Sequence, residues 1–150
     1  MDTLLAAIKK QLQDDDDLSY IRDSDIYITP DTLYIPAGKA LPCIGIKDGD
    51  ITREELISDV WQVKLSVSIS VYVEILRDEA TIIGDEATEK KGILQIVSDI
   101  NTSLDQNLLD ITGMQAAVSP SETASGVFEK DNRLLSMKTI NFEYVQEINR

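Results

Sequence analysis

The chain has 150 residues, 43% hydrophobic and 27% charged, which is typical of one globular domain and excludes a disordered chain. Its net charge of −13, from 27 acidic and 14 basic residues, opposes binding to nucleic acid or to an anionic membrane. The absence of histidine removes the commonest general base and zinc ligand, and a single cysteine, Cys43, excludes an internal disulfide framework.

The first residues predict an amphipathic helix from Thr3 to Gln13, because their apolar side chains share one helical face. These side chains are Leu4, Leu5, Ile8 and Leu12. The run Asp14–Asp17 is expected to end the helix and to form a solvated loop, since negative charges at a helix C-terminus oppose the helix dipole. The N-terminal residues do not resemble a signal peptide, and no stretch approaches a membrane span, so we expect a soluble intracellular protein.

Prolines and glycines interrupt residues 18–46, so only short strands are expected there. They are predicted at Asp25–Thr29, Thr32–Ile35 and Pro42–Lys47, and Cys43 is expected to be a small buried side chain. The third strand is expected to end at an acidic turn, Asp48-Gly49-Asp50.

Residues 48–55 are similar to the end of an EF-hand loop, which needs acidic ligands at its first, third and fifth positions and a glutamate at its twelfth. With Asp48 and Asp50 as third and fifth ligands, the first position would be Ile46 and Glu55 would fall at the tenth. The spacing therefore favours an acidic turn between strands over a calcium site.

A strict alternation of apolar and polar residues begins at Val63 and ends at Ile75, with an apolar residue at every odd position. This period predicts a β-strand. At about 3.3 Å per residue, a strand from Gln62 to Ile75 spans roughly 46 Å, against about 38 Å for the diameter of a compact domain of this length. We expect the strand to bend at a bulge or to project beyond its domain.

The remaining residues predict a charged connector at Arg77–Gly92, overlapping an amphipathic helix at Ala87–Asn107, and then a strand at Ile111–Ser119. A polar mobile loop at Ser119–Gly126 and a second long strand at Leu134–Ile148 complete the chain. The order of elements predicts a single α+β domain over residues 1–150. Its sheet is expected to be mainly antiparallel, to contain one very long strand and to be flanked by two helices.

The polar side of the long strand is the candidate functional surface, formed by Ser66, Ser68, Ser70, Tyr72 and Glu74. Serine is small and neutral enough for close approach, so we expect this side to face solvent or another subunit rather than a ligand. The sequence has no glycine-rich phosphate loop and no Cys–His pair. No catalytic, metal or cofactor residue is predicted, and an enzyme is not expected.

The pattern of elements resembles the tail terminator and tail-completion proteins of tailed bacteriophages. The resemblance lies in the N-terminal helix, the run Leu41-Pro42-Cys43-Ile44-Gly45-Ile46, the long alternating strand and the closing run Ile140-Asn141-Phe142-Glu143-Tyr144. It covers most of the chain in element order and hydrophobic pattern, without a diagnostic motif. It implies a small structural subunit that forms a ring, typically hexameric, which caps the tail tube and joins the tail to the head.

The resemblance also implies a place in the virion tail, assembly in the host bacterial cytoplasm, and contacts with further copies of the chain, the tail tube protein and head–tail connector proteins. A negative ring lumen fits this role, because DNA can then pass through without specific binding. Two alternatives remain: an acidic regulatory or DNA-mimic protein that binds a basic partner, and a small-ligand-binding or enzymatic α+β domain. No cofactor and no membrane contact are expected.

Overall fold

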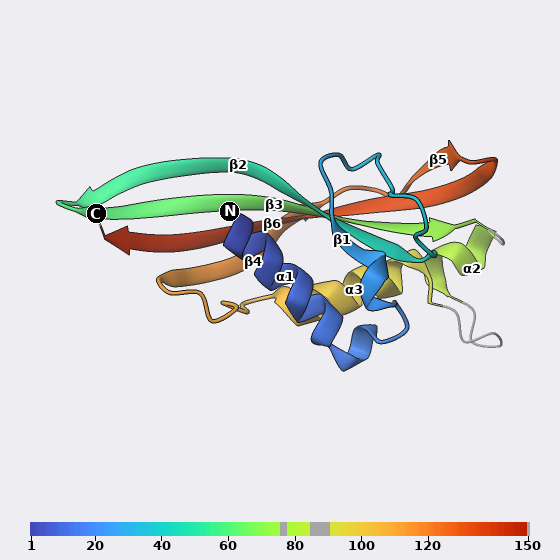
Figure 1. The fold of residues 1–150 in the computed structure, drawn as a ribbon, viewed down its shortest axis with the longest axis horizontal. Coiled ribbons are helices and arrows are strands. Elements are labelled where there is room, and N and C mark those ends of the chain that lie inside the picture. The colour runs from blue at the N-terminus through green and yellow to red at the C-terminus, as the bar shows by residue number, and fades with distance from the viewer. Residues whose placement is uncertain (76–77, 85–90, 150) are drawn as a thin grey trace.

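The computed structural model describes residues 1–75, 78–84 and 91–149, and it arranges them as a twisted sheet with helices on one face (Figure 1). The sheet has the strand order β1-β2-β3-β6-β4, and β5 pairs with β6 beside this path. Every pair is antiparallel except β1 with β2, so the predicted α+β class with a mainly antiparallel sheet is confirmed. The elements are α1 (Asp2–Asp14), β1 (Ile26–Ile28), β2 (Cys43–Ile57), β3 (Val60–Glu74), α2 (Asp78–Ile83), α3 (Ile93–Leu104), β4 (Met114–Glu122), β5 (Gly126–Lys130) and β6 (Arg133–Asn149).

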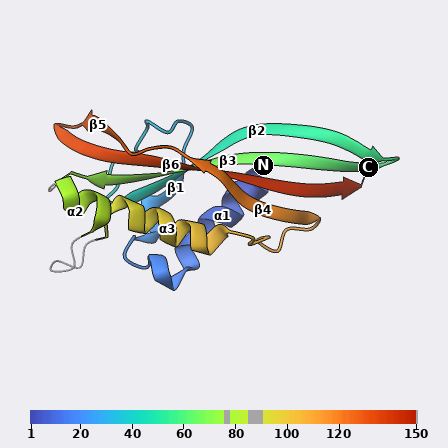
Figure 2. The same cartoon turned by 180° about the vertical axis from the view of Figure 1, so that it is seen from behind.

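Three long strands, β2, β3 and β6, form the centre of the sheet and extend at one end past the helices (Figures 1 and 2). The alternation of apolar and polar residues explains the length of β3. Successive side chains point to opposite faces of the sheet from Val60 to Glu74, so the apolar residues at odd positions share one face. At about 3.3 Å per residue, the 15 residues of β3 span roughly 50 Å. Of the two expectations for this strand, a bend at a bulge or projection beyond the domain, Figures 1 and 2 show projection past the helices, with the turn between β2 and β3 at the far tip.

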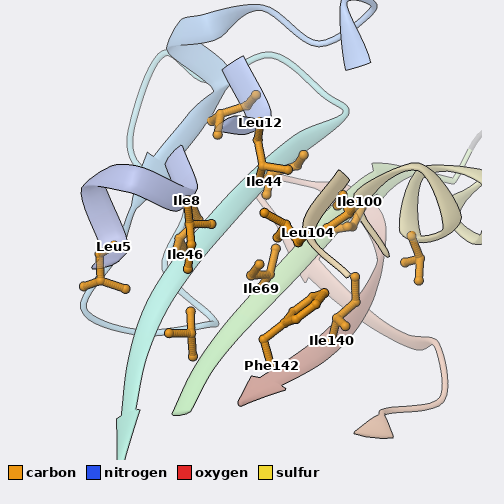
Figure 3. Close-up of a cluster of buried hydrophobic side chains, with 14 of the residues drawn as sticks. Leu5, Ile8, Leu12, Ile44, Ile46, Ile69, Ile100, Leu104, Ile140 and Phe142 are labelled. Carbon is orange, nitrogen blue, oxygen red and sulfur yellow. The ribbon is translucent and has the colours of Figure 1, made fainter. Parts of the chain in front are cut away.

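The main core lies between the helices and one face of the sheet (Figure 3). Ile46, Ile69 and Ile140 are register partners on β2, β3 and β6, and all three are completely buried. Ile8 of α1 and Ile100 of α3 pack against this face, as their helical spacing predicts. Burying each such side chain stabilises the fold by about 1.5–3 kcal/mol, so these layers hold α1 and α3 on the sheet.

A smaller cluster lies on the opposite face of the sheet, toward the end of β3 that is far from the tip. It contains Tyr27, Ile35, Cys43, Tyr72 and Leu135. The prediction that Cys43 is a small buried side chain is confirmed, and burial raises the pKa of its thiol to about 11. This face of the sheet is therefore covered at one end by the chain itself.

Two predictions for residues 18–50 are wrong. Thr32–Ile35 forms no strand, because the Asp31 carboxylate accepts the backbone N–H of Leu33 at 2.9 Å and holds a turn there. The acidic turn at Asp48-Gly49-Asp50 is instead a β-bulge, through which β2 continues to Ile57. Gly49 permits this close approach, since a Cβ atom there would lie 2.9 Å from the backbone oxygen of Ser66.

Several helices begin or end at residues other than those predicted. Asp14–Asp17 ends α1 as predicted, but Asp16–Leu18 then forms a short 3-10 turn capped by the Asp15 carboxylate. Six residues of the predicted connector form α2, and the predicted start of the following helix at Ala87 lies outside the described residues. That helix ends at Leu104, before Asn107.

The polar segment predicted as a loop at Ser119–Gly126 is partly strand. β4 is shifted toward the C-terminus and reaches Glu122, and the additional strand β5 begins at Gly126. Both strands pair with β6, whose bounds agree with the prediction to within one residue at each end. Pairing with a long partner strand overrides the local preference of these polar residues for a loop.

Candidate assembly surface

The structure divides the five predicted surface residues of β3 into two groups. Ser66, Ser68 and Glu74 are half-buried and remain reachable from solvent. Ser70 and Tyr72 are completely buried within the chain. The prediction that they belong to an exposed assembly face is corrected by this burial.

Tyr72 is buried because it belongs to the smaller hydrophobic cluster. Its ring meets the ring of Phe128 edge to face, with centroids 6.0 Å apart and planes at 76°. Its hydroxyl donates a hydrogen bond to the backbone carbonyl of Thr32, in the segment that covers this end of the sheet. Burial raises the pKa of Tyr72 to about 12, so the side chain is neutral at physiological pH.

Ser68 and Ser70 of β3 form cross-strand hydrogen bonds. The hydroxyls of Ser70 and Thr139 lie 2.9 Å apart, and Ser68 donates to the Asn141 side-chain oxygen at 3.3 Å. The Asn141 amide then donates to the hydroxyl of Ser121 on β4 at 3.0 Å. These hydrogen bonds link strands β3, β6 and β4.

A buried carboxylate holds the covering segment, residues 29–42, in place. Asp25 is 2% exposed, and its oxygens accept hydrogen bonds from the Arg22 guanidinium at 2.8 and 3.1 Å. One of those oxygens also accepts the backbone N–H of Ala40 at 3.0 Å. The hydrogen bond from Arg22 is the largest cause that lowers the pKa of the Asp25 carboxyl below its usual range. The sequence offered no signal for this contact beyond an acidic residue before a short strand.

The outer edge of β2 is paired over only a short part of its length. β1 pairs with Ile44–Ile46, and the last bond on that side joins the Thr29 N–H to the Ile46 carbonyl at 2.8 Å. In the described part of the chain, no strand pairs with the outer edge of β2 over residues 47–57. This open edge carries Asp48, Asp50 and further acids, a charge pattern that prevents non-specific edge pairing.

The hairpin tip, residues 54–60, combines charge with exposed apolar side chains. A turn at Ser58 and Asp59 joins β2 to β3, and Asp59 has a φ of 66°, a left-handed conformation that aspartate tolerates. Leu56 is 44% exposed and Ile57 is 68% exposed. This surface is absent from the sequence-based predictions because they end the strand at Asp48-Gly49-Asp50. The apolar pair Leu56-Ile57 before Ser58-Asp59 is the pattern that could have indicated a second strand end and turn.

At the opposite end of β3 lies the basic pocket, about 290 Å³ in volume, lined by Lys39, Lys130 and Arg133 with Tyr34, Ile35 and Leu41. Two lysine ammonium groups are oriented by backbone carbonyls, since Lys130 donates to Ile35 and Lys39 donates to Ser24. Arg133 lies 3.8 Å from Glu74 and keeps 45% of its side chain exposed. Asp131 is the acidic residue of the lining, so the pocket is locally positive in a strongly negative chain.

The described residues contain no group of three or more cysteine, aspartate or glutamate side chains placed to hold a metal ion. Asp48 and Glu55, which match part of the EF-hand pattern, lie apart along β2 instead of converging in a loop. The helices within the described ranges all fall short of the length and apolar character needed to cross a bilayer.

No protein-family model matches the chain, and no curated protein matches its sequence. Its fold is similar to that of a chain in the solved structure titled "Virion of native gene transfer agent (GTA) particle". The two superpose with a TM-score of 0.56 and 14% sequence identity, over 95% of this chain and 94% of the other. At this identity the likeness shows a shared fold that spans almost the whole of both chains.

Proposed function

We propose that the chain is a virion structural protein of the tail-terminator type. It forms a ring, hexameric by analogy with the resembled family, that caps a phage tail tube and joins the tail to the head. The observation that carries the proposal is the fold shared with a chain of the gene transfer agent virion over 95% of this sequence. The element order and hydrophobic pattern resemble the tail-terminator family independently of that likeness.

The long central strands support a role in assembly. They project beyond the helices and leave the outer edge of β2 open over residues 47–57 within the described chain (Figure 1). Open strand edges in proteins are usually paired or covered, and neighbouring subunits of a ring provide such a cover. A contact between two different surfaces of the same chain closes into a ring when the rotation between subunits permits it.

The charge supports the same role. Six copies carry −78 in total, six times the −13 of one chain, and a negative lumen lets DNA pass without the phosphate contacts that would hold it. The same charge opposes assembly of the isolated protein. We therefore expect a weak oligomer that strengthens as salt screens the repulsion between subunits, and stable rings on the end of the tail tube.

In this role the chain has structural partners and no substrate or cofactor. The partners are its own copies, the tail tube protein and the head–tail connector proteins, and assembly takes place in the host bacterial cytoplasm. Its place is the head-proximal end of the virion tail, outside any membrane.

Two measurements test the proposal together. Light scattering over a range of protein and salt concentrations should show the 16.7 kDa chain associating as both increase. Electron microscopy of purified tails, labelled with an antibody against the chain, should show label at the head-proximal end. A chain that is monomeric throughout and absent from tail ends contradicts the proposal.

A further inference from the structure

We infer that the hairpin tip of one copy binds in the basic pocket of the next copy, which makes this pair of surfaces the head-to-tail contact of the ring. The inference rests on the proposed ring and names the residues that hold it together. It follows from the charge, the exposure and the positions of the two surfaces.

The hairpin tip is acidic and apolar. Within residues 54–60 it carries Glu54, Glu55 and Asp59 and no lysine or arginine, so its formal charge is −3. All three acids are exposed, and Ile57 between them is 68% exposed at the end of β2. Leu56 and Ile57 form an exposed aliphatic pair beside the two-residue turn. Such a pair gains stability by burial against a partner, at about 25 cal/mol per Å² of apolar surface removed from water.

The basic pocket is complementary to the tip in both respects. Lys39, Lys130 and Arg133 supply three positive charges against the one negative charge of Asp131 in the lining, and Arg133 lies 3.8 Å from Glu74. The hydrogen bonds that the two lysines donate to carbonyl groups orient their charges without neutralising them. The apolar part of the pocket includes Tyr34, which is 53% exposed. An acidic, apolar segment can therefore bury its aliphatic side chains there while its carboxylates meet the cations.

The tip cannot reach the pocket of its own chain. Leu135 in the pocket pairs with Glu74 at the end of β3, whereas Val60 in the tip begins the same strand. The two surfaces are thus separated by the length of β3, roughly 50 Å for 15 residues at about 3.3 Å each. Figures 1 and 2 show the β2–β3 turn at one end of the long axis and the β5–β6 turn at the other.

The contact therefore joins two copies through unlike surfaces, which gives a head-to-tail arrangement rather than a two-fold dimer. Salt acts on it in two ways. The repulsion between chains of −13 acts over a Debye length of about 10 Å and is screened at moderate salt, whereas ion pairs formed within a partly buried pocket are screened less. The balance favours association at moderate ionic strength.

Charge reversal tests the contact. We expect Glu54→Lys with Glu55→Lys, and separately Lys130→Glu with Arg133→Glu, each to weaken self-association by at least about tenfold, the equivalent of 1.4 kcal/mol. A mixture of the two double variants should associate again. The reversed tip of the first variant meets the reversed pocket of the second, and the acidic tip of the second meets the basic pocket of the first. An alternating ring with an even number of subunits closes completely in this way.

Matched controls carry the same charge changes elsewhere. The controls are Lys9→Glu with Lys10→Glu on α1, and Asp14→Lys with Asp16→Lys at its end. Beyond the effect of the altered net charge, each control should change the association constant by no more than about twofold. Thermal melts confirm that each variant is folded. Sedimentation equilibrium over a range of protein concentrations gives the association constants.

A second measurement needs no change of charge. A double variant with Ser58→Cys in the tip and Ala37→Cys at the pocket should give a ladder of covalent oligomers with a short thiol cross-linker, since Cys43 is buried. The pair Ser58→Cys with Thr3→Cys on α1 should not.

The inference is overturned if the double variants associate like the wild type, if their mixture does not recover, or if the wild-type chain stays monomeric under every condition. A chain that fails these tests but labels tail ends leaves the proposed function standing without this contact. A chain that passes them but is absent from tail ends forms the contact without the proposed function.

Discussion

The carboxylate of Asp25 accepts a hydrogen bond of 3.0 Å from the backbone N–H of Ala40, across a segment that wraps over one face of the sheet. The same carboxylate is held by Arg22 at 2.8 Å and is almost completely buried. This contact ties the C-terminal part of the covering segment, at Ala40, to Asp25 just before β1.

The first prediction concerns this contact. Asp25→Ala should lower the free energy of unfolding at pH 7 by about 2 kcal/mol, because a hydrogen-bonded buried charge is lost. The Asp25 pKa is lowered in the fold, so its contribution is complete above the ordinary value of about 3.9 and decreases as pH falls below it. Urea unfolding at pH 7 and pH 3 should show the difference between variant and wild type shrinking at the lower pH. Equal stability at pH 7 would contradict the role of Asp25.

The second prediction concerns the two faces of β3. Ile69→Asp should lower the free energy of unfolding by more than about 4 kcal/mol, because it places an unpaired carboxylate at a completely buried position. Ser68→Asp, one residue away on the half-buried face, should have a clearly smaller effect on the isolated protein. Chemical denaturation compares the two, and similar losses would show that the assignment of faces is wrong.

The third prediction separates the interior of the polar face from its open part. Tyr72→Ala should destabilise the protein by about 3–5 kcal/mol, since it leaves a cavity in the smaller cluster. Ser66→Ala should change stability by less than about 0.5 kcal/mol in the isolated protein. Both values come from urea titration, and a mild effect of Tyr72→Ala would contradict its role in the packing of the smaller cluster.

The fourth prediction concerns the bulge in β2. Gly49→Val should destabilise the protein by about 1–3 kcal/mol, because its Cβ would lie 2.9 Å from the Ser66 carbonyl oxygen. Gly126→Ala is the control, since a Cβ there meets nothing within 4 Å. Thermal unfolding should show a lower Tm for Gly49→Val and not for Gly126→Ala. An unchanged Tm for Gly49→Val would indicate that the bulge lies at another residue.

The fifth prediction concerns calcium. The midpoint of thermal unfolding should be the same with calcium and with EDTA, because Asp48 and Glu55 lie along an extended strand and cannot converge on one ion. A rise of several degrees with calcium would require a ligand set that this arrangement lacks.

Local periodicity by itself determined the α+β class, the apolar faces of α1 and α3, and the long alternating strand. These features depend on apolar residues that recur every two positions in a strand or every three to four in a helix, and such spacings can be read from the sequence. Val67, Ile69 and Val71 share the main core for this reason. The bounds of β6 were likewise close, because its alternation continues almost to the end of the chain.

Tertiary structure alone decided what covers each face. Alternation puts Ser68, Ser70 and Tyr72 on one side of β3, but only the last two are buried, and it is the covering segment and β5 that contact Tyr72. The basic pocket likewise joins residues 34–41 with residues 130–135, which the register of β3 and β6 brings to one end of the sheet. Such contacts depend on loops and strand pairings between segments far apart in sequence. A local pattern shows which residues share a face, and only the assembled chain shows whether that face is interior or open.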